Sequence, residues 1–495
     1  MKNILIAIRS IFKKGRHNVM KIVSLGIGLA VGLVLIAKVY FEQSYDDFYP
    51  DRDRVYQVWA KYQQNGGELK DYPQTSGGIA PTMQQQIPEI ETVTRYTSFG
   101  DWTFTMTDTK MKYSGRCIIA DSCFFDILPR PMLIGNAKEV LSTPMYVLIS
   151  SRIAKNIGGD VIGKNFTVDS SPGRTMTIGG VFEEVPENSH SRYDVIVSMA
   201  SAGRFMWEGS PTNMLGNDRY ISYVKLHKGV NPLALEEQVH TFVNSYFPPE
   251  EQQKTGFNIG FSFHELDGLH KELPQVKRMT WILSLLAFAL IFTAVMNYIL
   301  IVISSIVNRS KEVAVHKCYG ASENNIHGMM FGEALVHIVL SLILALLLIL
   351  AFRGTVEELL ATSLDSLLLS NGSLVLLGIC ILVFFVSGFM PGSLYARIPV
   401  ASAFRNYREN KRIWKKALLL VQFVATGFLV TMLVFVARQY TFMVNDRPGY
   451  AYENLAYCGL AGVDSTSRAK ILDEVMRLPG VVAATTVYQL PFEHA

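Results

Sequence analysis

The sequence predicts a membrane α-helical fold, with five transmembrane helices and a large α+β extracytoplasmic domain between the first and the second. Apolar residues make up 49% of the 495 positions and charged residues only 18%, with a mean hydropathy of +0.22. A soluble protein carries nearer a quarter charged residues. The deficit is concentrated in five apolar stretches that are long enough, or nearly so, to cross a bilayer, which takes about 20 residues.

These stretches define the domain plan. The predicted spans are 22–41, 280–304, 336–352, 374–390 and 417–437. The first is too long for the apolar part of a signal peptide, and no A-x-A cleavage site follows it. The remaining segments are a basic helix (1–21), the outer domain (42–278), the part with spans two to four (279–410), a linker with the fifth span (411–437), and the start of a second outer domain (438–495).

Lysine and arginine set the orientation. Residues 1–21 carry basic side chains and no acid, and the loop between the fourth and fifth spans carries seven basic residues against Glu409 alone. The loop 353–373 is acidic, with Arg353 its one basic residue. Basic loops stay in the cytoplasm, so we expect a cytoplasmic N-terminus. Lys38, near the end of the first span, is expected to extend outward to water.

The outer domain has strand-like and helical patterns. Alternating or β-rich runs predict strands at 55–62, 102–106, 111–119, 145–149, 166–169, 175–182, 193–197 and 220–226. Helical periodicity fits 81–86, 150–157 and 232–246. Nothing in these patterns names a cargo or a partner.

Charge and cysteine usage argue against several functions. A net charge of +4 gives no case for nucleic-acid binding, and the sequence has no Cys-x-x-Cys pair and no His/Cys cluster with zinc spacing. We therefore expect no cofactor and no metal. Cys117 and Cys123 face an oxidising space on this topology, so they form either a disulfide or two unpaired thiols.

Two segments approach catalytic motifs and miss a requirement. Residues 158–165, GGDVIGKN, resemble a P-loop, but Asn165 stands where Ser or Thr must hold magnesium. His264 and His270 are six apart, whereas a zinc-binding helix needs histidines four apart to share a face. The sequence therefore predicts an ordinary turn in the first segment, no zinc site in the second, and no catalytic activity of its own.

Three polar residues are predicted at membrane depth. Asn297 lies inside the second span, and Glu333 and His337, four apart at the head of the third, share a helix face. Polar groups at this depth are candidates for function. The alternative is that they join helices by hydrogen bonds or lie at the interface, and the sequence leaves both open.

A short helix is predicted at the inner surface, after the second span. Its two faces carry different residues: Arg309, Glu312 and His316 on one, and Ala314, Val315 and Cys318 on the other. Gly320 suits a C-terminal cap. Such a helix either docks into a soluble partner or is a solvated connector.

These residues resemble the FtsX-like permease family in its MacB-type branch. Members carry a K-E-[IV]-x-[IV]-[RH]-K-x-x-G-A stretch after the second span, and residues 311–321 read KEVAVHKCYGA, with His316 where arginine is more usual. Other segments resemble later landmarks of the family: 42–48, 53–56, 120–125, 162–164, 186–190, and Gly388 with Pro391 and Pro399. Their order and spacing along nearly the whole chain make the resemblance specific.

The resemblance implies the permease subunit of an ABC transporter in the inner membrane, with ATP bound by a partner. Residues 309–321 are then the coupling helix that sits in a groove of a separate ATPase. Its site residues are Arg309, Lys311, Glu312, His316, Lys317 and Gly320. The implied function is export or extrusion of a hydrophobic or peptide cargo. The alternative is an FtsX-type transmitter of movement that regulates a cell-wall hydrolase and has no cargo.

Further partners follow from the same resemblance. They are membrane lipid, a second half or second copy that completes a dimer or pseudo-dimer, a periplasmic adaptor and an outer-membrane channel; no nucleic acid is expected. Residues 415–455 resemble the start of a second half with its own outer domain. We therefore expect a partial sequence of an eight-span permease.

Overall fold

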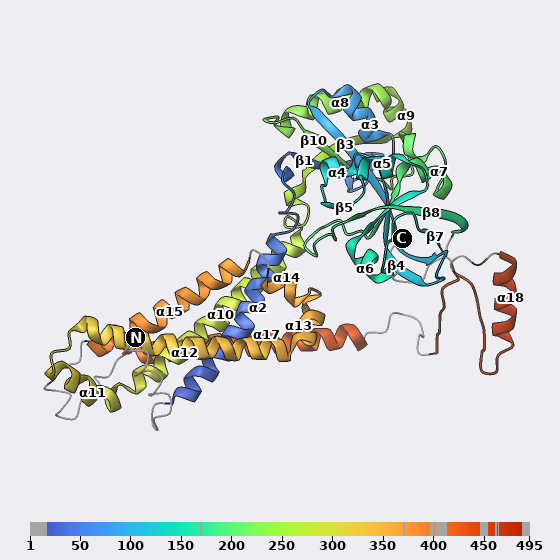
Figure 1. Ribbon diagram of the computed structural model, residues 1–495. Coiled ribbons are helices and arrows are strands. Elements are labelled where there is room, and N and C mark those ends of the chain that lie inside the picture. The colour runs from blue at the N-terminus through green and yellow to red at the C-terminus, as the bar shows by residue number, and fades with distance from the viewer. Residues whose placement is uncertain are drawn as a thin grey trace. The chain divides into compact units, whose positions relative to one another are not determined.

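The computed structural model describes residues 17–168, 171–369, 372–396, 400, 413–445, 454–460, 463 and 465–487 (Figure 1). The chain divides into two compact units, one from residues 1–45 and 270–447, the other from 46–269 and 448–495. We call the first the membrane unit, and residues 46–269 of the second the outer domain. The basic segments 1–16 and 401–412, which set the predicted orientation, and Gly449 with Tyr450 lie outside the described residues.

Five helices among the described residues are long and apolar enough to cross a membrane, as the sequence predicts. They are α2 (Asn18–Gln43), α10 (Pro274–Ser304), α12 (Glu323–Ala351), α15 (Ser373–Ala396) and α17 (Ile413–Asn445). Shorter helices connect them: α11 (Ile306–Cys318), α13 (Arg353–Leu360) and α14 (Leu364–Leu368). α12 begins at Glu323, well before the predicted third span at 336–352. Its first turns carry polar residues, so hydropathy alone does not detect that they are helical.

Glycines bring the first two spans together. A Cβ on Gly28 would lie 2.2 Å from the Cβ of Ala294, and one on Gly32 would lie 2.4 Å from Cγ1 of Ile291. The two glycines are four residues apart, so they form one smooth stripe on α2 that lets α10 approach closely. α2, α10, α12 and α15 share a single apolar core.

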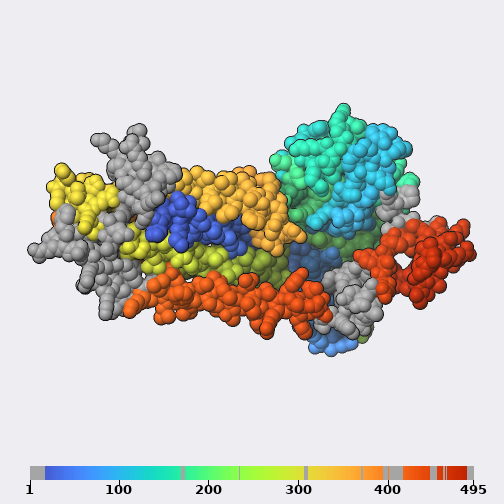
Figure 2. All heavy atoms as spheres, turned by 90° about the horizontal axis from the view of Figure 1, so that it is seen from below, coloured from blue at the N-terminus to red at the C-terminus, as the bar shows by residue number. Residues whose placement is uncertain are grey.

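α17 lies on the outside of this bundle. Figure 2 shows it as a continuous orange-red strip along the membrane unit. Only 6% of its most apolar window is buried, and it packs against α10. Its described side chains therefore need hydrocarbon or another helix around them.

The outer domain is built on a mixed sheet of eleven strands among the described residues, in the order β11-β1-β10-β3-β4-β9-β6-β8-β5, with β2 beside β1 and β7 beside β3 and β8. The strands are β1 (Val55–Gln64), β2 (Lys70–Tyr72), β3 (Ile90–Met106), β4 (Lys112–Ala120), β5 (Met132–Ile134), β6 (Tyr146–Ser150), β7 (Asn165–Val168), β8 (Ser171–Phe182), β9 (Val195–Ser198), β10 (Ile221–Leu226) and β11 (Phe257–Glu265). Pairs β4–β9 and β6–β8 are parallel, and the other pairs are antiparallel.

Short helices cover the sheet. α3 packs on β3 and β10, and α8 and α9 pack on β11, forming a group at one end of the domain in Figure 1. The helices and 3-10 turns are η1 (Arg52–Arg54), α3 (Ile79–Gln86), α4 (Phe124–Ile127), α5 (Ala137–Ser142), α6 (Ser151–Ile157), η2 (Met199–Ser201), α7 (Ala202–Phe205), η3 (Ser210–Thr212), η4 (Pro232–Leu235), α8 (Glu236–Tyr246), α9 (Pro249–Thr255) and η5 (Leu266–Gly268). This is the large mixed domain that the sequence predicts between the first two spans. After the fifth span, α18 (Ser465–Met476) is the described helix.

Candidate functional site

One side of α11, the helix after the second span, is packed onto the membrane unit. Ser310, Val313 and Ala314 are 2%, 1% and 1% exposed. Val313 and Ala314 belong to the same apolar core as residues of α2, α10 and α12. α11 is therefore packed directly against the spans. Arg309 lies in the first half of this helix.

The opposite side of α11 is exposed and mixed in polarity. We call its exposed residues the α11 face: Lys311, Val315, His316, Cys318 and Tyr319. Tyr319 is 89% exposed and Val315 is 43% exposed. Aromatic and apolar side chains beside polar and cationic ones are typical of a surface that binds another protein.

Gly320 ends the helix and fixes the turn that follows. Its φ is +86°, a conformation that strains any residue with a Cβ. Its N–H donates to the carbonyl oxygen of Lys317 at 3.0 Å, and the N–H of Ala321 donates to that of His316 at 3.0 Å. This is the Schellman cap that the sequence predicts. The Ser322 side chain then caps the start of α12.

The structure divides the faces of α11 differently from the prediction. The sequence places Ala314, Val315 and Cys318 on one face, but Ala314 is buried whereas Val315 and Cys318 are exposed. On the other predicted face His316 is exposed, but Glu312 is half-buried and, like the half-buried Lys317, already has an interaction partner within the chain. The moderate amphipathicity of this segment does not determine which side of α11 faces the spans. The packing of Val313 into the core of the spans determines it.

Lys21 and Glu333 form a buried ion pair between α2 and α12. The Nζ of Lys21 lies 3.7 Å from Oε1 of Glu333, and the side chains are 1% and 8% exposed. The same Nζ donates to Oδ1 of Asn18 at 3.2 Å. Burying two charges costs more than their attraction returns unless hydrogen bonds complete the site. A pair retained at this depth is therefore a candidate for function.

His337 extends this pair along α12. Its Nδ1 lies 3.1 Å from the hydroxyl of Tyr298 on α10, and Ser341 donates to a backbone oxygen of α2 at 3.1 Å. One face of α12 thus makes polar contacts to both α2 and α10. The structure brings Glu333 and His337 together, as the sequence predicts. It adds Lys21, which sequence analysis counted only among the basic residues that set orientation.

Asn297 is not part of this cluster. It is half-buried on α10, and its side chain makes no hydrogen bond to another described residue. Both interpretations of Asn297, a functional group or a contact between helices, stay open.

In the outer domain, Asp46 and His190 join two segments that carried the family resemblance. Asp46 is 0% exposed with φ +60°. Its Oδ2 lies 2.7 Å from Nδ1 of His190, and its Oδ1 accepts from the Ser189 hydroxyl at 3.0 Å. The Nε2 of His190 lies 2.5 Å from the hydroxyl of Tyr223 on β10. Burial raises the pKa of Tyr223 well above its ordinary value, so this hydroxyl stays protonated. The first residues of the domain are thereby fixed to its sheet.

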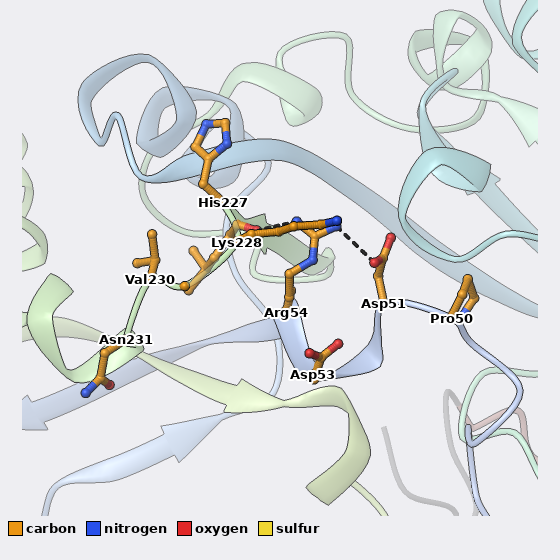
Figure 3. Close-up of a pocket in the computed structure, with 10 residues that line it drawn as sticks. Pro50, Asp51, Asp53, Arg54, His227, Lys228, Val230 and Asn231 are labelled. Atoms are coloured by element: carbon orange, nitrogen blue, oxygen red, sulfur yellow. Dashed lines mark hydrogen bonds and ion pairs between the residues drawn. The ribbon is translucent and has the colours of Figure 1, made fainter.

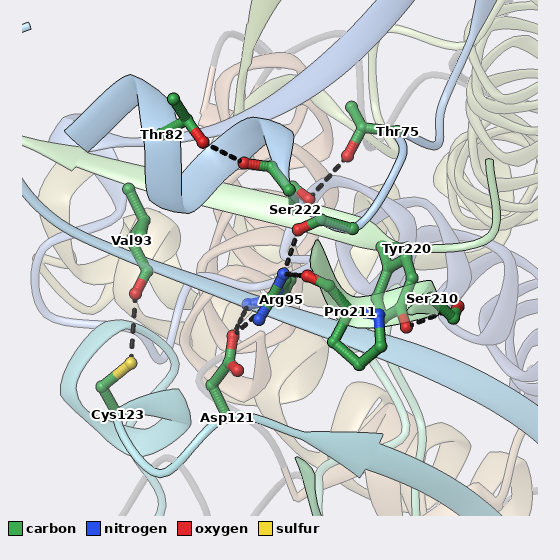
Figure 4. Close-up of polar contacts among 12 residues, drawn as sticks. Thr75, Thr82, Val93, Arg95, Asp121, Cys123, Ser210, Pro211, Tyr220 and Ser222 are labelled. Carbon is green, nitrogen blue, oxygen red and sulfur yellow. Dashed lines mark hydrogen bonds and ion pairs between the residues drawn. The ribbon is translucent and has the colours of Figure 1, made fainter. Parts of the chain in front are cut away.

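Arg95 holds two loops against the same sheet (Figure 4). Its Nε lies 3.2 Å from Oδ2 of Asp121, and its Nη1 donates to the carbonyl oxygens of Gly77 and Pro211. The guanidinium lies 5.6 Å from the ring centre of Tyr220. Burial raises the pKa of Asp121, and the neighbouring Arg95 only partly opposes this. The aspartate of the 120–125 segment therefore has a structural role as the partner of Arg95.

An open hollow of about 490 Å³ lies between η1 and the turn after β10 (Figure 3). Arg54 crosses it and pairs with Asp51 at 2.9 Å and with Glu91 at 2.7 Å. Lys225 lies 2.5 Å from the other oxygen of Asp51. Hydrogen bonds from Lys225 and Arg54 hold the pKa of Asp51 below its usual range. These charged groups are paired with one another, so the hollow is lined by a surface ion-pair network.

Neither near-miss motif forms the site that it resembles. Residues 158–165 make the turn between α6 and β7, with left-handed φ at its glycines. His264 lies on β11 with its ring stacked on Trp59, 4.1 Å between centres, whereas His270 follows η5. The two histidines therefore do not share a helix.

Two family models match the sequence. The model of the MacB-like periplasmic core domain matches residues 20–242, and the FtsX-like permease C-terminal model matches residues 284–400. Together they cover well over half of the chain and include the outer-domain sheet up to α8, α11 and the ion pair of Lys21 with Glu333. The chain belongs to the family of MacB-type, FtsX-like permeases.

Solved structures similar to this permease match its outer domain. A domain assigned to a permease of Porphyromonas gingivalis is 33% identical, with a TM-score of 0.41, and the match covers 44% of this chain and 91% of that chain. The periplasmic region of MacB from Actinobacillus actinomycetemcomitans is 16% identical, with a TM-score of 0.29 and coverage of 44% and 92%. The extracellular domain of the ABC-type transporter YknZ from Gram-positive bacteria is 10% identical, with a TM-score of 0.30 and coverage of 41% and 98%. A search of curated proteins finds no match.

The family fixes the general role of the chain. Its members are non-catalytic ABC permease subunits that work with a separate ABC ATPase. The five membrane-crossing helices agree with this, and the permease is a membrane protein.

Proposed function

We propose that this permease couples ATP hydrolysis by a separate ABC ATPase to movement of its outer domain, and so exports or extrudes a hydrophobic or peptide cargo. The packing of α11 supports the proposal. Val313 and Ala314 lie in the core of the spans, while the α11 face is exposed. A helix with one side in the core and the other free can take up a push from a partner and pass it to the spans.

The connectivity provides a route for that movement. α11 follows α10 directly and leads through the Gly320 turn into α12. The outer domain is inserted between the end of α2 at Gln43 and the start of α10 at Pro274. A change in tilt of α2 against α10 therefore changes the distance between the two ends of the inserted domain. The ion pair of Lys21 with Glu333 holds α2 on α12 in the present arrangement.

We place the permease in the inner membrane with its N-terminus in the cytoplasm. The basic composition of residues 1–21 and of the loop before the fifth span supports this orientation. It puts the α11 face on the side of the membrane where the ATPase and ATP are found.

Substitution Val315→Asp tests the docking role. Val315 is 43% exposed, so the change leaves the fold intact but places a charge in a contact that docking would desolvate. We expect wild-type abundance and at least about tenfold weaker capture of the ATPase, since an unpaired charge at such a contact costs several kcal/mol. The control Val313→Asp puts the same charge into the core and should lower abundance instead. Normal capture by Val315→Asp would show that the α11 face is not the docking surface.

Cargo is tested separately. The FtsX-like match is shared by relatives that transmit movement to a cell-wall hydrolase without cargo, and this is the alternative function. Neighbouring reading frames for an adaptor and an outer-membrane channel, with ATP-dependent loss of a hydrophobic compound or peptide from cells, support export. A neighbouring hydrolase, with outer-domain movement and no exported compound, supports the alternative. Membrane lipid and a second half or second copy are the further partners we propose.

A further inference from the structure

A second buried polar cluster lies at the other end of α2. One oxygen of Glu42 is 2.6 Å from Nζ of Lys38, and the other is 2.6 Å from Nε2 of His270. Lys38 also donates to the hydroxyl of Thr362 at 2.8 Å. Each carboxylate oxygen of Glu42 therefore has its own partner, Lys38 for one and His270 for the other.

The cluster is largely buried. Lys38, Glu42 and Thr362 are 7%, 5% and 5% exposed, and the His270 side chain is 18% exposed. Lys38 does not extend outward to water as the sequence predicted, because Glu42 and Thr362 provide partners inside the unit. Separating these groups would leave a buried charge without a partner, which is strongly unfavourable.

Aromatic contacts complete the arrangement. The ring of Tyr45 stacks on His270, with centres 3.4 Å apart and planes 8° apart. Phe41 also packs on Tyr45, edge to face with ring centres 5.6 Å apart, and its ring centre lies 5.0 Å from Nζ of Lys38. His270 is thus held at its edge by Glu42 and on its face by Tyr45. We call Lys38, Glu42, Tyr45, His270 and Thr362 the clasp.

The clasp joins three separate stretches of the chain. Glu42 and Tyr45 lie where the chain leaves the first span, and His270 lies where it returns, just before α10 begins. Thr362 lies between α13 and α14, in the connection from α12 to α15. We propose that Glu42, bonded directly to His270 and through Lys38 to Thr362, locks the two connections of the outer domain to each other and to the α13–α14 connection, so that all three move as one. This proposal adds a transmitting element to the proposed function and rests on it.

Hydrogen exchange of the full chain in lipid nanodiscs tests the clasp without any partner. We expect Glu42→Gln to speed amide exchange about tenfold or more in residues 43–47, 270–274 and 361–364 together. His270→Phe keeps a ring that can stack on Tyr45 but loses the bond to Glu42. It is the second test variant, for use if Glu42→Gln folds poorly. It should loosen residues 43–47 and 270–274 and leave residues 361–364 unchanged, because Lys38 still bonds to Thr362. The control Glu272→Gln breaks the exposed pair with Lys277 in the same connection and should change nothing beyond its own turn. Faster exchange confined to residues 43–47 would overturn the clasp.

A second arm uses the permease with its ATPase. Spin labels on the outer domain and on α13 report the change in distance when ATP is added. We expect His270→Phe to bind the ATPase and sustain hydrolysis as the wild type does, but to lose most of the distance change. An unchanged response in His270→Phe would refute the clasp as a transmitting element. A wild type that shows no response refutes the proposed function instead, and the exchange experiment still decides whether the clasp holds the three stretches together.

Discussion

The amino group of Lys21 on the first span faces the carboxylate of Glu333 on the third at 3.7 Å, and both side chains are nearly inaccessible to water. Together with Asn18, His337 and Tyr298, they form a polar cluster in contact with three spans. Such a cluster either holds the bundle together or takes part in its movement. The two roles predict different results when the charges are removed singly and in pairs.

Removal of Glu333 alone should destabilise the permease. Glu333→Ala leaves the Lys21 charge buried without its ion-pair partner, which typically costs about 3–5 kcal/mol. We expect lower abundance in the membrane and a lower melting temperature in detergent, measured by fluorescence-detected size-exclusion after heating. Wild-type abundance and melting would show that water or another group readily replaces Glu333.

Removal of both charges separates structure from function. Lys21→Met with Glu333→Leu fills the site with apolar groups, an exchange that is often neutral or stabilising. We expect abundance and melting temperature to return to at least the wild-type values. If ATPase stimulation and outer-domain movement also return, the pair is structural. If they stay lost in a stable double variant, the pair acts in coupling.

The Gly28–Gly32 stripe gives an independent prediction for the packing of the spans. The Cβ of a larger residue at Gly28 would overlap that of Ala294, and the overlap is with a short side chain that cannot rotate away. We expect Gly28→Leu to force α2 from α10 and to cost about 1–3 kcal/mol, as overpacking of a core does. Gly378→Leu on α15, where nothing lies within 4 Å, is the control. Equal melting temperatures for the two variants would contradict the close approach.

The sequence predicts those elements that depend on local composition and on the periodicity of apolar residues. Five spans follow from hydropathy, and most of the outer-domain strands follow from alternation. β11 was not predicted, although Phe257, Ile259, Phe261 and Phe263 alternate along it and give a readable strand signal. Gly28 and Gly32 also carried a readable signal, since small residues four apart mark close helix packing.

Contacts between distant segments could not be read in the same way. Lys21 and Glu333, or Lys38 and Thr362, are brought together by packing of spans that lie far apart in the sequence, and no local pattern encodes the pairing. The rotation of α11 has the same origin. Its sequence allows several faces to be buried, and the core of the spans selects Val313 and Ala314.

Asp51 predicts a dependence of stability on pH. Its pKa in the folded chain is lowered by hydrogen bonds from Lys225 and Arg54, so its stabilising contribution is present above the unfolded value, about 4, and is lost as the pH falls through the folded value. Because Asp51 is 37% exposed, the contribution is about 0.5–1 kcal/mol at most. We expect Asp51→Asn to lower stability toward urea at pH 7 and to lower it less at pH 3. An equal loss at both pH values would assign the effect to something other than the charge.

Cysteine labelling checks the proposed orientation with the thiols that the chain already has. Cys318 on the α11 face and Cys458 after the fifth span are both exposed, so burial protects neither of them. Cys117 is buried, and burial raises its pKa well above the ordinary value, so it should react slowly wherever it lies. With a cytoplasmic N-terminus, an odd number of spans separates the two exposed thiols and places Cys318 inside and Cys458 outside. A membrane-impermeant maleimide on intact spheroplasts should therefore label Cys458 and leave Cys318 until the membrane is opened. In a Cys123→Ser background, which removes the half-buried thiol of the outer domain, Cys458→Ser should abolish the rapid labelling of sealed cells, and Cys318→Ser should abolish the additional labelling after lysis. Rapid labelling of Cys318 in sealed spheroplasts would reverse the orientation, and with it the assignment of the α11 face to a cytoplasmic ATPase.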